Sequence, residues 1–163
     1  MHQADPALAA LIPHQGAMCL NDSVLEWDDE HVVLATRTHT SQGNPLRHDG
    51  RLRAVHLCEY GAQAMAVHGG LCARAAGTRA APGLLVALRS VRLHTDYVED
   101  LQGELRVTAA RLLATPESWQ YAFRVEHQGR VLAEGRAAVM MRREGSEAEA
   151  GSYNAPVNRS PGE

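Results

Sequence analysis

The sequence predicts an α+β fold in which a curved antiparallel sheet wraps around one long helix. Two observations predict it. Residues 53–68 are apolar and rich in small side chains, with Gly61, Ala62 and Ala64 in the middle, which is typical of a buried helix that another element approaches closely. Residues 84–141 alternate between apolar and polar side chains, which is typical of antiparallel strands with one buried face.

The first elements of the chain are short. Residues 5–11 favour a helix, because Asp5 can cap its start and Pro6 suits its first turn. Residues 20–27 and 31–38 then predict two strands, which an acidic turn joins.

A polar loop separates these strands from the central helix. Residues 40–51 contain Gly, Asn, Pro and Asp without any periodicity, so they predict a loop. The helix begins near Arg53. It ends near Gly69 and Gly70 or continues to Ala76.

Four strands are expected after the helix. The alternation is clearest where aromatic and aliphatic side chains face one way and polar side chains face the other. Gln128 and Gly129 can form the tight turn of a hairpin. The expected strands are residues 84–93, 103–113, 119–126 and 131–141.

Composition excludes several classes of protein. The 163 residues carry a net charge of −3, which argues against a nucleic-acid-binding protein. No apolar run reaches the length of a membrane span, the N-terminus lacks the pattern of a signal peptide, and the three cysteines show no paired spacing. We therefore expect a cytoplasmic chain without membrane contact, metal or cofactor. Residues 5–141 should form one domain, and residues 142–163, dominated by Gly, Ser, Glu, Pro and Asn, a disordered tail.

Glu59 is the candidate for chemistry inside the helix. It stands between Leu57 and Val67, and Gln63 shares its face of the helix because the two are four residues apart. Loss of water around a carboxyl group favours its neutral, proton-donating form, which is how a general acid is made. The alternative is a partly exposed Glu that merely solubilises the helix.

Three short motifs follow one another along the chain: residues 11–14 (Leu-Ile-Pro-His), residues 20–24 (Leu-Asn-Asp-Ser-Val) and residues 57–64 (Leu-Cys-Glu-Tyr-Gly-Ala-Gln-Ala). In this order they resemble the Leu-Pro-His, Leu-Val-Asp-Arg-Val and Leu-Glu-Ala-Met-Ala-Gln segments of the hotdog-fold 3-hydroxyacyl-[acyl-carrier-protein] dehydratases. The resemblance spans most of residues 8–141. Residues 59–69 look closest to the ApeP-like branch, found in clusters that make aryl polyenes.

The resemblance implies an activity and some of its residues. The expected reaction removes water from a 3-hydroxyacyl carrier-protein thioester, giving a trans-2-enoyl thioester in fatty-acid or polyene biosynthesis, without a cofactor. Glu59 matches the catalytic Glu of the family. Backbone amides around Ala54 and Val55, at the start of the helix, are expected to bind the thioester oxygen, and Gln63 to orient the carboxyl group.

The general base is less clear from the sequence. The family carries a His-Phe-Pro loop before the helix, and here Asn44 and Pro45 stand at the matching place, where they could bind substrate or simply form a turn. His48, in the same loop, is the candidate base; otherwise the subunit lacks one. His14 is expected to fix the entry of the chain, and His68 to lie near the helix end.

The resemblance also implies partners. We expect acyl carrier protein, an acidic protein, and a homodimer or a heterodimer with another hotdog dehydratase, with sites at the seam. Two alternatives remain: a hotdog acyl thioesterase, and a non-catalytic subunit that pairs with an active dehydratase. A positive rim for the carrier protein could include Arg47, Arg51, Arg53, Arg74, Arg79, Arg89 and Arg92.

Overall fold

The computed structural model describes residues 6–141. Its helices are α1 (Pro6–Ala9) and α2 (Leu57–Ala75), with short 3-10 turns at Gly16–Met18, Thr38–Thr40 and Ala54–His56. Its strands are β1 (Ser23–Trp27), β2 (His31–Thr36), β3 (Gly83–Leu93), β4 (Leu105–Ala114), β5 (Ser118–His127) and β6 (Arg130–Met141). The predicted tail, residues 142–163, lies outside the described residues.

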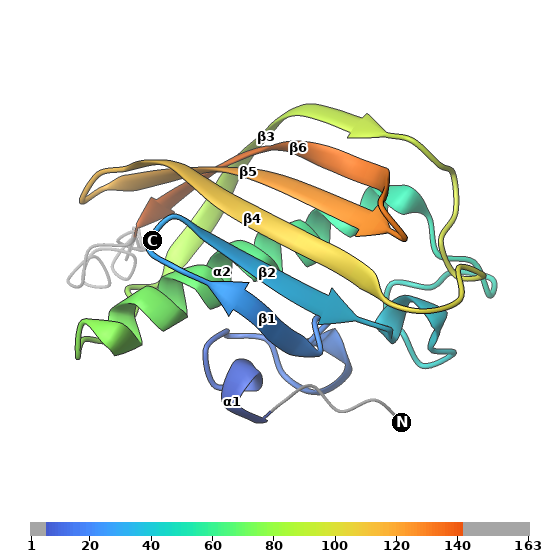
Figure 1. Cartoon of the computed structure of the whole chain (residues 1–163), viewed down its shortest axis with the longest axis horizontal. Coiled ribbons are helices and arrows are strands. Elements are labelled where there is room, and N and C mark those ends of the chain that lie inside the picture. The colour runs from blue at the N-terminus through green and yellow to red at the C-terminus, as the bar shows by residue number, and fades with distance from the viewer. Residues whose placement is uncertain (1–5, 142–163) are drawn as a thin grey trace, which may run out of the picture.

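The six strands form one antiparallel sheet in the order β1-β2-β4-β5-β6-β3. The sheet curves over α2, which packs against β2, β4, β5 and β6 (Figure 1). The predicted fold class, a curved antiparallel sheet around one long helix, is confirmed. Within residues 6–141, no helix combines the length and apolar character needed to span a membrane.

The structure moves two predicted boundaries and selects between two alternatives for a third. The first strand begins at Ser23 rather than Leu20, because the Leu20 amide donates to the side chain of Gln63 and not to a neighbouring strand. The first helix ends at Ala9, two residues before the expected end. The central helix runs through the two glycines to Ala75, which is the longer of the two predicted alternatives.

The glycines of α2 allow other segments to approach its backbone. A Cβ atom on Gly61 would lie 2.7 Å from the ring of Phe123 in β5, and one on Gly69 would lie 2.8 Å from the Trp119 ring. A Cβ on Gly70 would lie 3.0 Å from the carbonyl oxygen of Leu11. The small residues that predicted a buried helix therefore mark the faces where β5 and the N-terminal segment touch it.

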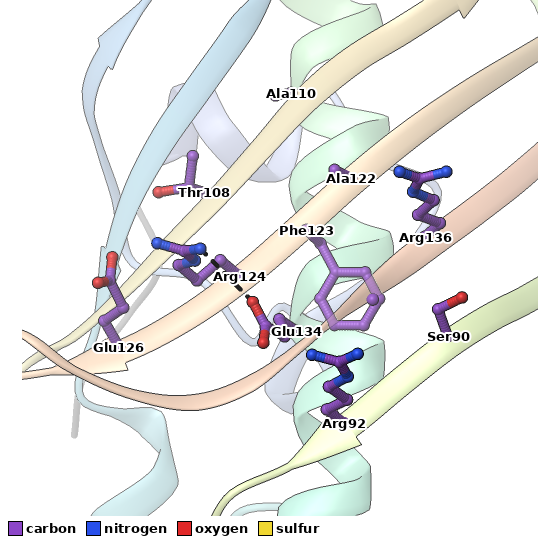
Figure 2. Close-up of a pocket in the computed structure, with 11 residues that line it drawn as sticks. Ser90, Arg92, Thr108, Ala110, Ala122, Phe123, Arg124, Glu126, Glu134 and Arg136 are labelled. Atoms are coloured by element: carbon purple, nitrogen blue, oxygen red, sulfur yellow. Dashed lines mark hydrogen bonds and ion pairs between the residues drawn. The ribbon is translucent and has the colours of Figure 1, made fainter.

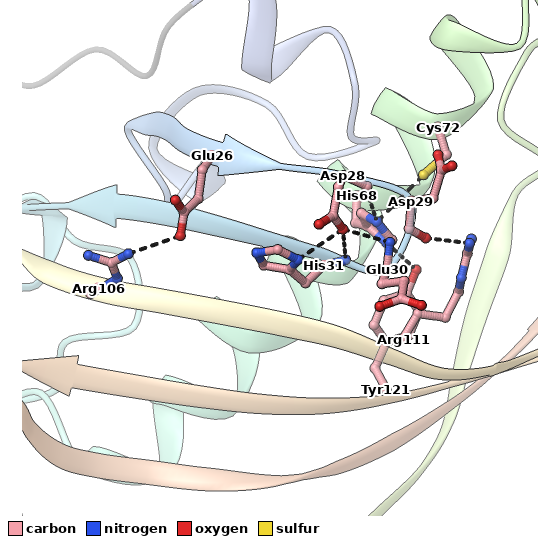
Figure 3. Close-up of polar contacts among 10 residues, drawn as sticks. All are labelled: Glu26, Asp28, Asp29, Glu30, His31, His68, Cys72, Arg106, Arg111 and Tyr121. Carbon is pink, nitrogen blue, oxygen red and sulfur yellow. Dashed lines mark hydrogen bonds and ion pairs between the residues drawn. The ribbon is translucent and has the colours of Figure 1, made fainter.

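A buried polar cluster fastens the far half of α2 to the sheet (Figure 3). His68 has no exposed surface, which corrects its expected place near a helix end. Its Nε2 donates to the Asp28 carbonyl at 2.9 Å, and its Nδ1 accepts from the Tyr121 hydroxyl at 2.8 Å. In this arrangement both ring nitrogens are satisfied in the neutral form. Burial lowers the pKa of His68 accordingly.

Replacing Gly61 should test the close approach of β5. Alanine normally stabilises a helix interior by about 1 kcal/mol relative to glycine. Here we expect Gly61→Ala to destabilise the fold by about 1 kcal/mol or more, because the added methyl group meets the Phe123 ring near its attachment point. Urea unfolding measures the change, with Gly43→Ala, whose added Cβ meets only Ser41 at 3.7 Å, as the control. A Gly61→Ala variant as stable as the parent would contradict this packing.

His68 should make the stability of the fold depend on pH. Because its pKa is lower in the folded chain than the ordinary value of about 6.5, the unfolded chain binds the proton more readily. The stabilisation is therefore present above that pH and is lost on acidification. We expect His68→Gln to reduce the loss of unfolding free energy between about pH 7.5 and about pH 5.5. The exposed His48→Gln serves as the control, and an unchanged slope in His68→Gln would refute the assignment.

Candidate functional site

Glu59 lies in the first turn of α2. Its side chain is 34% exposed, so it is neither fully buried nor free in solvent. Its Oε1 accepts a hydrogen bond from Gln63 Nε2 at 3.1 Å and lies 3.2 Å from His14 Nε2. Two nitrogen atoms from different segments therefore hold one carboxylate oxygen.

The orientation of Gln63 follows from its other partners. Its side chain is almost completely buried. The Leu20 amide can only donate, so it fixes Oε1 as the atom at 2.9 Å, and Nε2 donates to the Met18 carbonyl at 2.8 Å. The second hydrogen of Nε2 is thereby directed to Glu59. The predicted proximity of Gln63 to the carboxyl group is present in the structure.

The two oxygens of Glu59 have different surroundings. Oε1 contacts the nitrogens of Gln63 and His14, whereas Oε2 has no hydrogen-bond partner within residues 6–141. Since a carboxyl group held at one oxygen exchanges its proton through the other, Oε2 is the atom that can reach a substrate. The arrangement suits proton transfer to a ligand at the start of α2.

Asn44 supports the loop that borders this end of the helix. Its Nδ2 donates to the Tyr60 hydroxyl at 2.8 Å and to the Thr38 carbonyl at 3.0 Å, and its Oδ1 accepts from the Leu46 amide at 2.9 Å. Asn44 is buried and its amide group is fully used, which is the arrangement of a turn-forming residue; Pro45 beside it is exposed. Burial raises the pKa of Tyr60, so its hydroxyl remains a neutral member of this network.

His48 stands apart from this group in the isolated chain. Its side chain is 92% exposed at the tip of the loop, and its charged neighbour is Asp49 at 3.3 Å. Within the described residues, no hydrogen bond or ion pair joins it to Glu59. The structure therefore brings together Glu59, Gln63 and His14, and leaves His48 on the surface.

The start of the helix is held by a neighbouring segment. The Ala54 amide donates to the Asp96 carbonyl at 2.9 Å, so this amide already has a partner. Val55, one residue later, is half-exposed, and the first amides of a helix have no partner inside it. Of the two expected donors, Val55 is therefore the one suited to a ligand.

Glu99 is a buried carboxylate that the sequence did not single out. It accepts hydrogen bonds from the Leu52 amide at 3.0 Å and from the Arg51 guanidinium group, which also lies over the Tyr97 ring at 3.8 Å. Burial alone would raise its pKa, but these hydrogen bonds outweigh burial and hold the pKa of Glu99 below its usual value. The ionised Glu99 fixes the chain just before α2.

No metal centre accompanies these residues: within residues 6–141, no three His, Cys, Asp or Glu side chains are grouped so that they could hold an ion. The groups that the structure brings together are proton donors and acceptors. A carboxyl group, an imidazole and a helix-start amide are groups that general acid–base chemistry uses.

The fold and this site define a hotdog-fold protein. The chain resembles the dehydratase heterocomplex ApeI:P from Xenorhabdus doucetiae, with a TM-score of 0.75 and 24% identity over 84% of this chain and 91% of that chain. A hypothetical thioesterase with coenzyme A from Streptococcus pneumoniae TIGR4 is similar at a TM-score of 0.55 and 13% identity, covering 74% of this chain and 84% of that one. A mutant of the phenylacetic acid degradation protein PaaI from Thermus thermophilus matches at a TM-score of 0.55 and 15% identity, over 85% and 100%.

The sequence itself shows to which protein family the chain belongs. The sequence model of the ApeP dehydratases matches residues 6–150, which is most of the chain. The chain therefore belongs to the ApeP-like dehydratase family, and the resemblance drawn from the three motifs is confirmed. No curated protein matches the chain.

The three hydrogen bonds of Gln63 predict a large effect of its removal. Gln63→Leu keeps the size of the side chain but leaves the Leu20 amide and the Met18 carbonyl without their partner. We expect a loss of about 2 to 6 kcal/mol of unfolding free energy, since each of the two unpaired buried polar groups costs about 1 to 3 kcal/mol. Chemical denaturation measures it, with the exposed Gln102→Leu as the control. Equal stability of the two variants would show that Gln63 does not fasten the N-terminal segment.

Proposed function

We propose that the chain dehydrates 3-hydroxyacyl thioesters to trans-2-enoyl thioesters, with Glu59 as the acid that protonates the departing hydroxyl group. Membership of a dehydratase family supports this proposal. The observation that carries it is the geometry of Glu59, whose Oε1 is held by Gln63 and His14 while Oε2 has no such partner among the described residues. A solubilising Glu would need neither contact.

The reaction needs proton transfers at two neighbouring carbons. A base removes the proton next to the thioester carbonyl, and the hydroxyl group on the following carbon leaves with a proton from Glu59 Oε2. Negative charge develops on the thioester oxygen, where the Val55 amide at the positive end of α2 can stabilise it. The Glu59 carboxylate that remains is stabilised by the Gln63 amide and by His14.

Two histidines are candidates for the base. His48 is the predicted base, and its high exposure at a loop tip suits a residue that reaches a partner's site across an interface. His14 is the second candidate, because its Nε2 lies 3.2 Å from Glu59 in the same chain. Alanine variants of each, assayed in the assembled enzyme, assign the role to the histidine whose loss stops turnover.

The proposed partners are an acyl carrier protein and a companion hotdog dehydratase in the cytoplasm. A relative of known structure is a dehydratase heterocomplex, which supports the second partner. For the carrier protein, Arg47, Arg51 and Arg53 precede the 19-residue α2, whereas Arg74 lies in its last turn and Arg79 beyond it. The proposed rim for the carrier protein is therefore the group before the helix.

A second candidate function is a non-catalytic subunit of such a complex. The separation of His48 from the Glu59 group within one chain favours it where His14 is not the base, since a site without a base cannot act alone. In this case the companion chain would carry both catalytic groups. The assay that separates the two functions is made on the purified chain with and without a companion dehydratase.

Glu59→Gln should remove most of the dehydratase activity. Glutamine keeps the shape and the contact with Gln63 but has no carboxyl proton to donate. We expect turnover of a 3-hydroxyacyl carrier protein to fall by about a hundredfold or more, the usual contribution of a general acid, with fold and association unchanged. Mass spectrometry of the thioester measures the loss of water and also detects free acid, the product of a thioesterase.

The control for this experiment is Glu104→Gln, an exposed carboxylate that contacts only Arg37 among the described residues. It should retain full turnover. If the chain is inactive alone and Glu59→Gln leaves the activity of the complex unchanged, the catalytic role of Glu59 is excluded and the non-catalytic subunit is supported. Release of free acid without the enoyl product would instead identify a thioesterase.

A further inference from the structure

The edge strand β3 carries a run of exposed apolar side chains: Leu84, Leu85, Val86, Leu88, Val91 and Leu93. It pairs with β6 on one side only, and every residue of it except Ala87 is exposed. Leu84 is 60% exposed and its neighbour Leu85, which points to the opposite face, is 38% exposed, so both faces of the strand lack cover. A long apolar edge of this kind is a template for pairing with another chain.

The charges on this edge all have the same sign. Arg89 and Arg92 are the only charged residues of β3, and Arg136 of β6 lies directly opposite Arg89. Within residues 6–141, none of these three guanidinium groups has a carboxylate in ion-pair distance. Like charges directly opposite each other on neighbouring strands are destabilising, so this arrangement calls for an external anion.

The nearest carboxylate is already occupied. Glu134 lies opposite Arg92 in the register, but its Oε2 accepts from Arg124 at 3.5 Å and its Oε1 lies 3.3 Å from His94. Figure 2 shows Glu134 joined to Arg124, while Arg92 and Arg136 stand on either side of Ser90. The positive charge at the edge is therefore not neutralised from within the described chain.

A β-bulge places these arginines on one face. Arg89 and Arg92 are three residues apart, so in a regular strand they would point to opposite faces. Their partners Arg136 and Glu134 are two apart, and the extra residue of β3 is accommodated at Ser90, whose φ of 53° is unusual for a residue with a side chain. The bulge therefore gathers Arg89, Arg92 and Arg136 beside the open edge.

We propose that β3 pairs with the edge strand of a different hotdog chain. The group of three arginines, Arg89, Arg92 and Arg136, selects this strand because it carries carboxylates that face them. This inference rests on the companion subunit of the proposed function and specifies its chemistry. Carboxylates on the partner strand would pair with guanidinium groups that the chain itself leaves unpaired, while the exposed apolar residues of β3 would be covered.

A second copy of this chain is a poor occupant of the same edge. If two β3 strands pair about a two-fold axis at Leu88, the middle residue of Gly83–Leu93, Arg89 lies opposite Ala87 of the copy and diagonal to its Arg89. Such diagonal neighbours are about 7 to 8 Å apart. Arg92 and Arg136 add to the repulsion from each copy, so the pattern disfavours a homodimer and favours a complementary chain.

A charge exchange on this chain alone tests the inference. The double variant Arg89→Glu/Arg92→Glu supplies an edge strand with carboxylates. Mixed with the parent chain at low salt, it should form a one-to-one complex in size-exclusion chromatography with light scattering, at concentrations where neither protein alone does. Added salt should weaken the complex. The control Arg74→Glu/Arg79→Glu, changed at the other end of α2, should not associate with the parent.

Three results would overturn the inference. The first is a parent homodimer as stable as the mixed complex, and the second is a mixture that stays monomeric. The third is an edge that binds acyl carrier protein, together with a companion chain that binds the double variant as tightly as it binds the parent. With a companion dehydratase, the double variant should bind at least tenfold more weakly than the parent. Association is measured without substrate, and Glu59→Gln should not change it. Loss of activity with intact association therefore refutes only the proposed function, and unchanged association of the double variant refutes only this inference.

Discussion

The side chain of Gln63 joins the parts of the chain on which the site depends. It bonds the Leu20 amide and the Met18 carbonyl of the segment before β1, and it also donates to Glu59 on its own helix. Because this segment also carries His14, fastening it to α2 brings the imidazole to the carboxyl group. One buried amide thus sets both the fold of the N-terminal segment and the geometry of the proton donor.

Packing around α2 explains why such a precise arrangement is possible. The helix presents glycines to Phe123 and Trp119 of β5, so the sheet lies close to its backbone and leaves little room for movement. Farther along, neutral His68 is bonded to Tyr121 and to the turn after β1. In the first turn, Glu59 remains partly exposed and can meet a ligand.

Much of the fold could be predicted because its signals are local. The alternation of residues 119–126 and the small residues around Gly61 depend only on neighbours in the sequence, and so does the spacing of Glu59 and Gln63. The contact of His14 with Glu59 could not be predicted in this way, because the two are far apart in the chain and meet only when the N-terminal segment folds back onto α2.

The roles of two glycines and of one backbone amide could not be predicted from the sequence either. The pair after His68 suggested the end of the helix, whereas its function is to admit neighbouring side chains, which only the packed structure reveals. Ala54 was expected to offer its amide to a substrate, but the carbonyl of Asp96, far along the chain, takes that hydrogen bond. The proposed role of His48 as a base would need a second chain, so neither the sequence nor a single subunit assigns it.

The account depends most directly on the position of Glu59 Oε2 relative to a substrate. A crystal structure of the chain, with its companion dehydratase, bound to a non-hydrolysable 3-hydroxyacyl thioester analogue would measure it. The account predicts that Oε2 lies within about 2.6 to 3.2 Å of the 3-hydroxyl oxygen, the range for proton transfer, while Oε1 keeps its contacts with Gln63 and His14. An analogue bound only at the companion's own carboxylate, with Glu59 out of reach of its hydroxyl group, would contradict it.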